Sequence, residues 1–420
     1  MSFKSGSSQV DFPTLEKELL DYWYKEGIVK KYLEKNKTSR IKFSFLDGPI
    51  TANNPMGVHH GWGRTYKDLW QRFYNMKGFS ERFQNGFDEQ GLWVEVEVEK
   101  ELGLKSKKDI ENLVPGDKFK SLEKFINLCK ERVKKYSAIQ TEQSKRLGYF
   151  MDWDNSYHTS SDENNYAIWN YLKIVNEKGW LYKGLDSVPW CPRCGTAISQ
   201  HEIETDGYQL LTHESIYFKL PIIGRDGEFL LVWTTTPWTI PANVAVAVNP
   251  KEKYVLIEGS NSEKLWVMKK RLQINGAEKP IDQKDGNELV GWEYEAPFDD
   301  LELVKVSLGG YHHRVIDGRE FVTDLEGTGL LHVAPGAGSE DFQLGLKENL
   351  HIVAPIEEDA SYVSGMGEFA GKNAKTNPEL IINYLRKKYR GKFFEKTEKY
   401  EHRYPTCWRC KHELVWRVVD

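Results

Sequence analysis

The sequence of 420 residues lacks the features that mark membrane, secreted and strongly basic proteins. It contains no run of about 18 apolar residues, which is the length that a membrane-spanning helix needs. The N-terminal segment has no apolar signal core. The 58 Lys and Arg residues nearly balance the 62 Asp and Glu residues, so no overall basic field indicates a nucleic-acid partner. We therefore expect a cytoplasmic protein without membrane contact, in which RNA would bind only a local patch.

Cysteine is also scarce, with five residues in the chain, and this excludes a disulfide scaffold. Four of the five form two C-x-x-C pairs, Cys191 with Cys194 and Cys407 with Cys410. Two residues between thiolates let both reach one ion at about 2.3 Å, and four thiolates complete a tetrahedral zinc site. Reduced unmetallated pairs and a redox C-x-x-C are the alternatives. The pattern favours structural Zn²⁺, because four thiolates leave no ligand position open for water.

Hydrophobic periodicity predicts an α/β organisation for the first part of the chain. Segments with helical spacing alternate with short apolar segments that end at glycine. The expected helices cover residues 12–35, 58–77, 91–102 and 117–148, and the expected strands cover 41–47 and 80–85. This order is typical of the first half of a doubly wound, Rossmann-like parallel sheet. The helix over 117–148 is rich in lysine, and we interpret its charged side as a solvated face.

The pattern of hydrophobic and turn-forming residues changes near residue 190. Residues 205–370 contain many short β-rich segments separated by Gly, Pro and Asn turns. This pattern predicts a closed or sandwiched β domain inserted into the α/β domain. A helix is expected over 378–390, and the final residues, ELVWRVVD, have the pattern of a strand. At about 150 residues per domain, the length predicts two to three domains.

The segment 47–60, DGPITANNPMGVHH, lies where the first strand gives way to a helix. Free N–H groups at a helix start, together with imidazoles, can hold a triphosphate. Taken alone, His59 and His60 are equally well explained as turn or capping groups. The segment resembles the signature of class I aminoacyl-tRNA synthetases, in which a proline- and glycine-rich turn runs into H-I-G-H. In a gapless alignment His60 matches the final histidine, while Gly57 and His59 exchange the first and third residues. The resemblance implies that Gly57, His59 and His60 bind ATP and that the two histidines are catalytic, with His59 replacing the missing first histidine.

The segment 85–95, NGFDEQGLWVE, resembles the G-W-D-x-H-G-L-P-x-E pattern of the isoleucyl-tRNA synthetase family. Asp88 matches the carboxylate that holds the substrate ammonium, and Gln90 occupies the position of the usual histidine. Pro49 matches a position that lines the amino-acid pocket. The resemblance therefore implies that Pro49, Asp88 and Gln90 bind substrate. Without it, Asp88 is equally well explained as a capping carboxylate.

Two segments of the β-rich region resemble the editing site of the same family. Residues 232–243 carry an uninterrupted threonine triplet, and residues 327–341 contain a histidine and an aspartate that match the other half of that site. The implied editing residues are Thr234, Thr235, Thr236, Trp238, Thr239, His332 and Asp341. On their own, these segments are an ordinary strand and an ordinary loop. An apolar pocket separates isoleucine from valine poorly, which is the physical reason for a second, hydrolytic site.

Together these resemblances imply an isoleucine-tRNA ligase that uses ATP with Mg²⁺, isoleucine and tRNA(Ile), edits valyl-tRNA, and is a monomer when complete. No residue can be assigned to Mg²⁺. We find no K-M-S-K-S loop and no second half of the nucleotide sheet, so we expect a truncated portion that makes no adenylate alone. The implied domains are 1–150, the first catalytic half; 151–204, a connection with the first zinc half-site; 205–394, a β-barrel editing domain; and 395–420, the second zinc half-site.

Two alternatives remain open from the sequence. The first is a valyl- or leucyl-type synthetase, although those relatives carry an arginine after the second threonine and this chain does not. The second is a zinc-stapled module that binds RNA acceptor ends without chemistry, for which the basic helix over 117–148 would provide the local positive patch.

Overall fold

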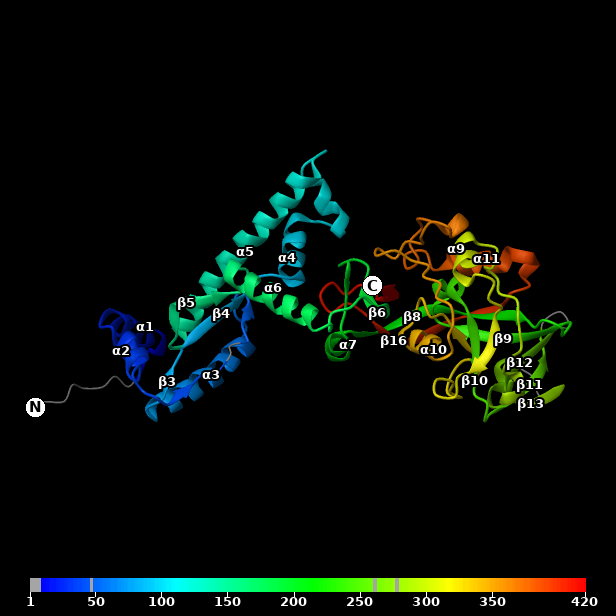
Figure 1. Cartoon of the computed structure of the whole chain (residues 1–420), viewed down its shortest axis with the longest axis horizontal. Coiled ribbons are helices and arrows are strands. Elements are labelled where there is room, and N and C mark those ends of the chain that lie inside the picture. The colour runs from blue at the N-terminus through cyan, green and yellow to red at the C-terminus, as the bar shows by residue number, and fades with distance from the viewer. Residues whose placement is uncertain (1–8, 46–47, 260–262, 276–278) are drawn as a thin grey trace, which may run out of the picture. The chain divides into compact units, whose positions relative to one another are not determined.

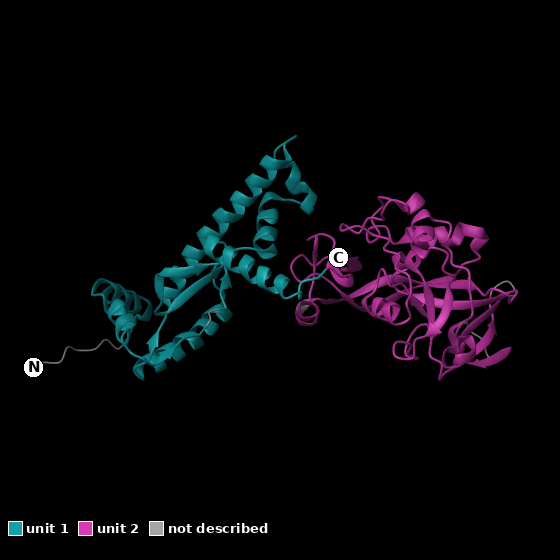
Figure 2. Cartoon of the chain, viewed as in Figure 1, with its two compact units in different colours: residues 1–182 teal, residues 183–420 magenta. Residues whose placement is uncertain are grey.

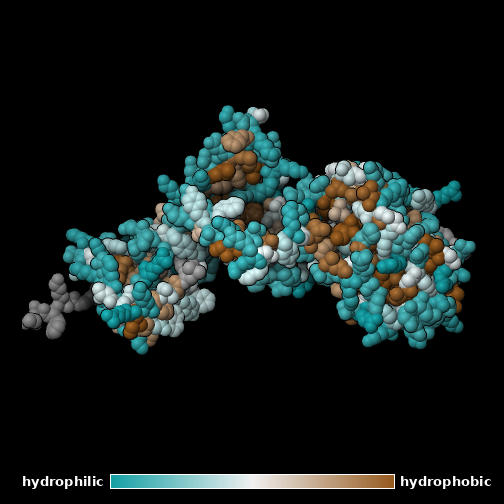
Figure 3. All heavy atoms as spheres, viewed as in Figure 1, coloured by the Kyte–Doolittle hydropathy of each residue, from teal (hydrophilic) through white to brown (hydrophobic). Residues whose placement is uncertain are grey.

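The computed structural model describes residues 9–45, 48–259, 263–275 and 279–420. The chain forms two compact units, residues 1–182 and 183–420 (Figure 2). The face drawn in Figure 3 is mainly hydrophilic, and hydrophobic residues reach it in separate patches on both units. Among the described residues, no helix is both long enough and apolar enough to cross a membrane.

Unit 1 is built on short parallel strands. Strand β1 (Lys42–Phe43) pairs with β3 (Ser80–Glu81), and β4 (Gln84–Asp88) lies between β2 (Ile50–Thr51) and β5 (Asp152–His158). Every one of these pairings is parallel, so each connection must cross over the sheet, and helices provide the crossovers (Figure 1). The predicted strand over 41–47 corresponds to β1, and the predicted strand over 80–85 corresponds to β3 and the start of β4, whereas β2 and β5 were not predicted. Leu46 and Asp47, at the end of the predicted first strand, lie outside the described residues.

The helices of unit 1 are α1 (Phe12–Lys25), α2 (Ile28–Glu34), α3 (Val58–Met76), α4 (Leu92–Leu102), the 3₁₀ segment η1 (Lys107–Asn112), α5 (Lys118–Arg146) and α6 (Asp162–Glu177). They match the predicted segments, except that the first predicted helix is broken in two and that η1 and α6 were not predicted. The single helix predicted over 12–35 is wrong, because Gly27 adopts φ 65° and breaks it into α1 and α2. A left-handed residue ends the helical hydrogen-bond ladder, and glycine adopts that conformation without a Cβ penalty.

Unit 2 contains a large mixed sheet. Its strands are β8 (Tyr208–Pro221), β9 (Glu228–Thr234), β10 (Ala245–Val248), β11 (Lys253–Glu258), β12 (Lys264–Met268), β13 (Asp282–Asp285), β14 (Arg314–Asp317), β15 (Leu331–Val333) and β16 (Phe394–Pro405). Strand β9 pairs with β8 along one side, while β12 and β15 share its other side. The sheet therefore branches at β9 and curls around a core with large buried side chains such as Phe218, Tyr254 and Trp266.

The remaining elements of unit 2 are short helices and 3₁₀ segments around this sheet. They are α7 (Gln200–Asp206), η2 (Pro237–Ala242), η4 (Lys269–Asn275), α8 (Gly286–Leu289), α9 (Glu302–Leu308), α10 (Ser339–Lys347), η5 (Gly367–Phe369), α11 (Glu379–Lys387) and η6 (Lys388–Gly391). A second, three-stranded sheet has the order β17 (Val415–Val419), β6 (Asp186–Cys191), β7 (Thr196–Ala197). The antiparallel pair β8 and β16 joins the part of the chain that carries this small sheet to the large sheet (Figure 1).

Candidate functional sites

The carboxyl edge of the unit 1 sheet carries the residues predicted to bind substrate. Asp88 ends β4 and lies opposite Thr51 of β2, whose hydroxyl donates to the Asp88 carboxylate over 2.8 Å. Pro49 precedes β2 and is half-buried. Gln90 is exposed, and its side-chain amide donates to the carbonyl of Thr159 over 3.0 Å. Ligands of open parallel sheets generally bind at this edge.

The two histidines of the predicted nucleotide turn lie in the first turn of α3. The backbone N–H of Gly57 donates to Nδ1 of His60 over 3.0 Å, so the ring caps the helix start. The rings of His59 and His60 lie with their centroids 3.9 Å apart. Burial lowers the pKa of His60, and the neighbouring His59 and Arg64 lower it further. A neutral His60 that accepts at Nδ1 must carry its proton on Nε2, which makes Nε2 a hydrogen-bond donor.

Helix α5 fixes the turn that precedes these histidines. Arg132 is buried, and its guanidinium donates to the side-chain oxygen and the carbonyl of Asn53, each over 2.7 Å. Gln140 donates to the carbonyls of Thr51 and Asn54, and Gln143 accepts from the N–H of Met56 over 2.8 Å. The interpretation of this helix as a solvated basic face is therefore only half right. Its inner side is polar because it satisfies backbone groups of the segment that runs from the end of β2 to Met56.

The same sheet edge contains a polar group that the sequence analysis missed. The carboxylate of Glu89, only 6% exposed, lies 2.7 Å from Nδ1 of His158 and accepts from the hydroxyl of Ser160 over 2.6 Å. A buried carboxylate needs such partners because its ionised form is costly to desolvate. Glu89 and His158 are far apart in the sequence, and no local pattern signals that β4 and β5 bring them together.

The threonine-rich segment forms a tight turn at the end of β9. Thr234 is the last residue of the strand, and its hydroxyl accepts from the N–H of Thr236 over 3.1 Å. Thr239 and Trp238 lie in η2, and the Thr239 hydroxyl donates to the carbonyl of Thr236 over 2.9 Å. Thr234 and Thr235 line a cavity of about 240 Å³. The predicted triplet is thus partly accessible from this cavity.

His332 lies in β15 behind this turn. Its Nε2 is 3.1 Å from the hydroxyl of Thr239, and its Nδ1 is 2.8 Å from the side-chain amide of Asn243. Burial lowers the pKa of His332 to about 4, so the ring is neutral near pH 7. Both ring nitrogens are occupied by protein groups, and His332 therefore supports Thr239 rather than facing the cavity with a free nitrogen. Asn243 closes the threonine-rich segment and was not singled out from the sequence.

Asp341 lies in the first turn of α10. Its carboxylate accepts from the N–H of Ala334, the residue that follows β15, over 2.9 Å. Burial raises the pKa of Asp341 to about 6. No hydrogen bond joins Asp341 to the threonine triplet among the residues that the structure describes. The two predicted halves are linked instead through β15, which pairs with β9 and contains His332.

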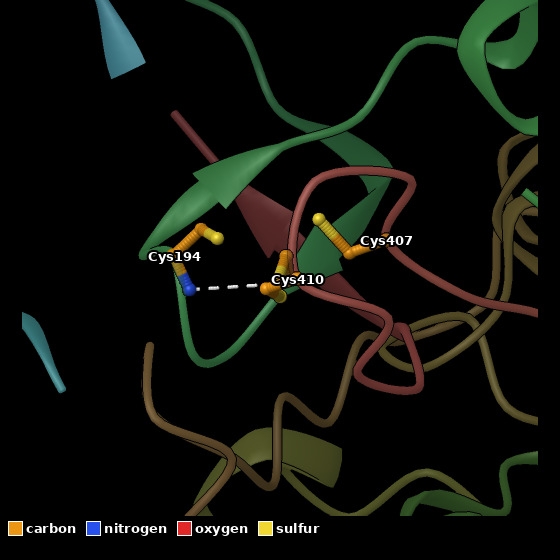
Figure 4. A group of neighbouring side chains, drawn as sticks. Cys194, Cys407 and Cys410 are labelled. Atoms are coloured by element: carbon orange, nitrogen blue, oxygen red, sulfur yellow. Dashed lines mark hydrogen bonds between the residues drawn. The ribbon is translucent and has the colours of Figure 1, made fainter. Parts of the chain in front are cut away.

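The four predicted cysteines form one cluster, and Figure 4 shows three of them, Cys194, Cys407 and Cys410. Cys191 is the last residue of β6, Cys194 lies in the turn between β6 and β7, and Cys407 and Cys410 follow β16. All four sulfur atoms lie within 4.8 Å of one another, and those of Cys191 and Cys410 are 3.5 Å apart. Hydrogen bonds from Cys191 and Cys194 lower the pKa of Cys407 to about 6. Tetrahedral coordination at 2.3 Å requires sulfur separations of about 3.8 Å, so this group could hold a metal ion.

Comparison with known proteins connects these features to a family. The family model described as tRNA synthetases class I (I, L, M and V) matches residues 18–412. The chain is 39% identical over 417 residues to the isoleucine–tRNA ligase of Pyrococcus horikoshii, covering 97% of this chain and 38% of that protein. It is 37% identical to that of Sulfolobus acidocaldarius, covering 99% and 39%, and 36% identical to that of Clostridium acetobutylicum, covering 100% and 39%.

The chain thus spans somewhat more than a third of the length of the curated relatives that it matches. The family match covers both units, including the sheet edge at Asp88, the threonine-rich turn and the four cysteines. The chain therefore belongs to the class I tRNA synthetases of the isoleucine, leucine, methionine and valine group.

Proposed function

We propose that this chain is part of an isoleucine-tRNA ligase, in which unit 1 supplies half of the amino-acid activation site and unit 2 hydrolyses mischarged valyl-tRNA. The substrates would be isoleucine, ATP with Mg²⁺, and tRNA(Ile). The names of the relatives support isoleucine as the substrate. The contact of Thr239 with His332 is the main support for hydrolysis by unit 2, because it joins the two segments that resemble an editing site.

In unit 1, Asp88 would bind the α-ammonium of isoleucine, beside Pro49 and Gln90. The isoleucine carboxylate attacks the α-phosphate of ATP, giving isoleucyl-adenylate and pyrophosphate. His60 would donate from Nε2 to the phosphates, helped by the amides of the α3 N-terminus. His59, adjacent and exposed, would reach the same phosphates. These groups act by position and charge, because none of them forms a bond to the substrate.

Exposed apolar side chains on unit 1 support the proposal that activation needs further residues. On α3 these are Trp62, Tyr66, Leu69, Trp70, Phe73 and Met76, and on α6 they include Tyr166, Trp169 and Tyr171. Trp62 is 65% exposed and Trp169 is 71% exposed. Apolar surface of this extent normally meets a partner, and the part of the relatives that this chain does not match would supply one. We therefore propose that this chain alone makes no isoleucyl-adenylate.

In unit 2, the ester of a mischarged tRNA would bind between the threonine turn and Asp341. The ionised Asp341 carboxylate would hold the α-ammonium, and the threonine hydroxyls would position the attacking water. No side chain needs to act as a nucleophile. A pocket can use one methylene group for only about 1–3 kcal/mol, a limit established with synthetases of this kind rather than from this structure. That limit explains why a second site is needed.

We also propose that the four cysteines bind one structural Zn²⁺ ion. Their thiolate chemistry suits zinc, and three of the four are buried. The ion would tie the turn after β6 to the turn after β16, two segments that are more than 200 residues apart in the sequence. It would supply no catalytic chemistry, because all four ligand positions belong to cysteine.

The proposal is tested by incubating the purified chain with valyl-tRNA(Ile) and with isoleucyl-tRNA(Ile). We expect slow release of valine and little release of isoleucine, and Asp341→Ala should abolish the valine release. Failure to hydrolyse valyl-tRNA would contradict the hydrolytic function. Equal retention of charged and uncharged tRNA, without hydrolysis, would favour an RNA-binding module instead. A faster hydrolysis of another mischarged tRNA would favour a valyl- or leucyl-type enzyme.

A further inference from the structure

A continuous series of buried hydrogen bonds lies behind the threonine turn of unit 2. The hydroxyl of Tyr294 donates to the side-chain oxygen of Asn243 over 2.8 Å. The amide nitrogen of Asn243 lies 2.8 Å from Nδ1 of His332 and 3.1 Å from the carbonyl of Ala245. Nε2 of His332 then contacts the hydroxyl of Thr239. Tyr294, Asn243 and His332 are 2%, 2% and 6% exposed, so water does not compete for these bonds.

The direction of each bond in this series is fixed by groups that can only accept. The carbonyl of Ala245 has no proton, so the Asn243 atom that contacts it must be the amide nitrogen. The same nitrogen has a second proton, and that proton points to Nδ1 of His332. Nδ1 must therefore be an unprotonated acceptor, and the neutral ring carries its proton on Nε2.

The donor and acceptor at each bond from His332 to Thr236 are fixed in the same way. The Nε2–H of His332 donates to the hydroxyl oxygen of Thr239. The Thr239 hydroxyl then donates its own proton to the carbonyl of Thr236, which can only accept. One direction of donation thus satisfies every group from Tyr294 to Thr236. Reversing the tautomer of His332 would bring two protons together between Asn243 and the ring.

We propose that Asn243, oriented by Tyr294, is a positioning residue that fixes His332 in its Nε2–H tautomer and thereby holds the Thr239 hydroxyl against the turn of the threonine triplet. The role in hydrolysis rests on the function proposed for unit 2, whereas the tautomer follows from the hydrogen bonds alone. A buried asparagine with three polar partners costs stability if any partner is lost, and filling space in a core does not need such a group.

The test compares the full chain with the variant Asn243→Asp, which keeps the shape but removes the amide donor. An ionised aspartate oxygen can only accept from Nδ1, so His332 must place a proton there above the pKa of the new carboxyl. Nitrogen NMR of ¹⁵N-histidine-labelled chain reads the protonation of each ring nitrogen, and His332→Gln identifies the His332 signals. Asn383→Asp, at an exposed position of α11, is the matched control. Tyr294→Phe keeps the amide but removes the group that orients its oxygen.

We expect the Nε2–H tautomer in the unmodified chain, in Asn383→Asp and in Tyr294→Phe, and a proton on Nδ1 in Asn243→Asp. Valyl-tRNA hydrolysis should fall by about 10- to 100-fold in Asn243→Asp, as for other groups that orient a functional side chain, with a smaller fall in Tyr294→Phe. An Nδ1–H tautomer in the unmodified chain would overturn the proposal without any variant. A changed tautomer with unchanged hydrolysis would overturn the positioning role. If the unmodified chain hydrolyses no mischarged tRNA, the proposed function of unit 2 fails, and the NMR result still decides the tautomer.

Discussion

Replacing Asp341 by asparagine should make unit 2 more stable at neutral pH while removing its hydrolytic activity. Asp341 accepts a hydrogen bond from Ala334, and an asparagine oxygen accepts the same bond, so the local geometry is kept. The substitution removes only the charge. Burying the charged Asp341 carboxylate lowers the stability of the fold. A residue that lowers stability is expected in a functional site, where function is gained at the expense of stability.

The size and sign of the effect follow from the pKa of Asp341, which burial raises from 3.8 to about 6. The folded chain therefore holds this proton more tightly than the unfolded chain, and the unfolding free energy falls as pH rises from about 4 to about 6. Two pKa units correspond to about 3 kcal/mol as an upper bound. Because part of the Asp341 residue remains exposed, screening by solvent reduces this, and we expect Asp341→Asn to gain about 1–2 kcal/mol above pH 7.

The assay is denaturant unfolding of the unmodified chain and the variant at pH 3.5 and at pH 7.5. The gain should be present at pH 7.5 and nearly absent at pH 3.5, where the carboxyl is protonated in the folded chain and mostly protonated in the unfolded chain. Glu379→Gln is the control, because it neutralises an exposed carboxylate in the first turn of another helix, α11. It should leave stability unchanged or lower it by about 0.3–1 kcal/mol. An equal gain at both pH values, or none at pH 7.5, would refute the reasoning.

The same pKa predicts the pH dependence of hydrolysis. Only the ionised carboxylate binds an ammonium, so the rate of valyl-tRNA hydrolysis should rise with pH through about 6. At one unit below the pKa about one tenth of the molecules are ionised, and the rate at pH 5 should be about one tenth of its plateau. Asp341→Asn should show no valyl-tRNA hydrolysis at any pH. A rate in the unmodified chain that does not change between pH 5 and pH 7 would show that this carboxylate does not bind the ammonium.

Three further predictions concern the other sites. Cys407→Ser should lower the zinc content of the purified chain from about one ion to near zero by metal analysis and lower its melting temperature, because three thiolates hold the ion less tightly; full zinc occupancy in the variant would contradict the site. Arg132→Met should lower the unfolding free energy by about 2–4 kcal/mol, because it leaves buried partners of the guanidinium unpaired, and a loss below about 0.5 kcal/mol would exclude the role of α5 in holding the turn. Gly57→Ala should displace the exposed imidazole of His59, since a Cβ there would lie 2.9 Å from its Cε1; unchanged NMR signals of His59 in the variant would contradict the contact.

Several elements could be predicted from the sequence because they depend on neighbouring residues. The helix predicted over 58–77 is observed as α3, and the helix predicted over 117–148 is observed as α5. Both have apolar residues at helical spacing, and this spacing is a local property. The break at Gly27 was missed because glycine also occurs within helices, and only its left-handed φ of 65° reveals the stop.

Some features of the candidate sites could also be predicted from neighbouring residues, and others depend on residues that are distant in the sequence. The spacing of Cys191 and Cys194 already suits one ion, and the second pair completes the cluster in the structure. The buried contacts of Arg132 could not be predicted, because a lysine-rich helix gives no sign of which residue turns inward. The role of Asn243 was equally hidden, since its partners Tyr294 and His332 lie on other elements of the fold.

The sequence by itself determined most of the helices, the cysteine pairs and the family to which the chain belongs, because periodicity, spacing and motif identity are properties of residues close together along the chain. The tertiary structure alone decided which nitrogen of His332 carries the proton, how far the pKa of the Asp341 carboxyl is raised, and which side of α5 is buried. These properties depend on burial and on hydrogen-bond partners from distant segments, and folding brings those segments together.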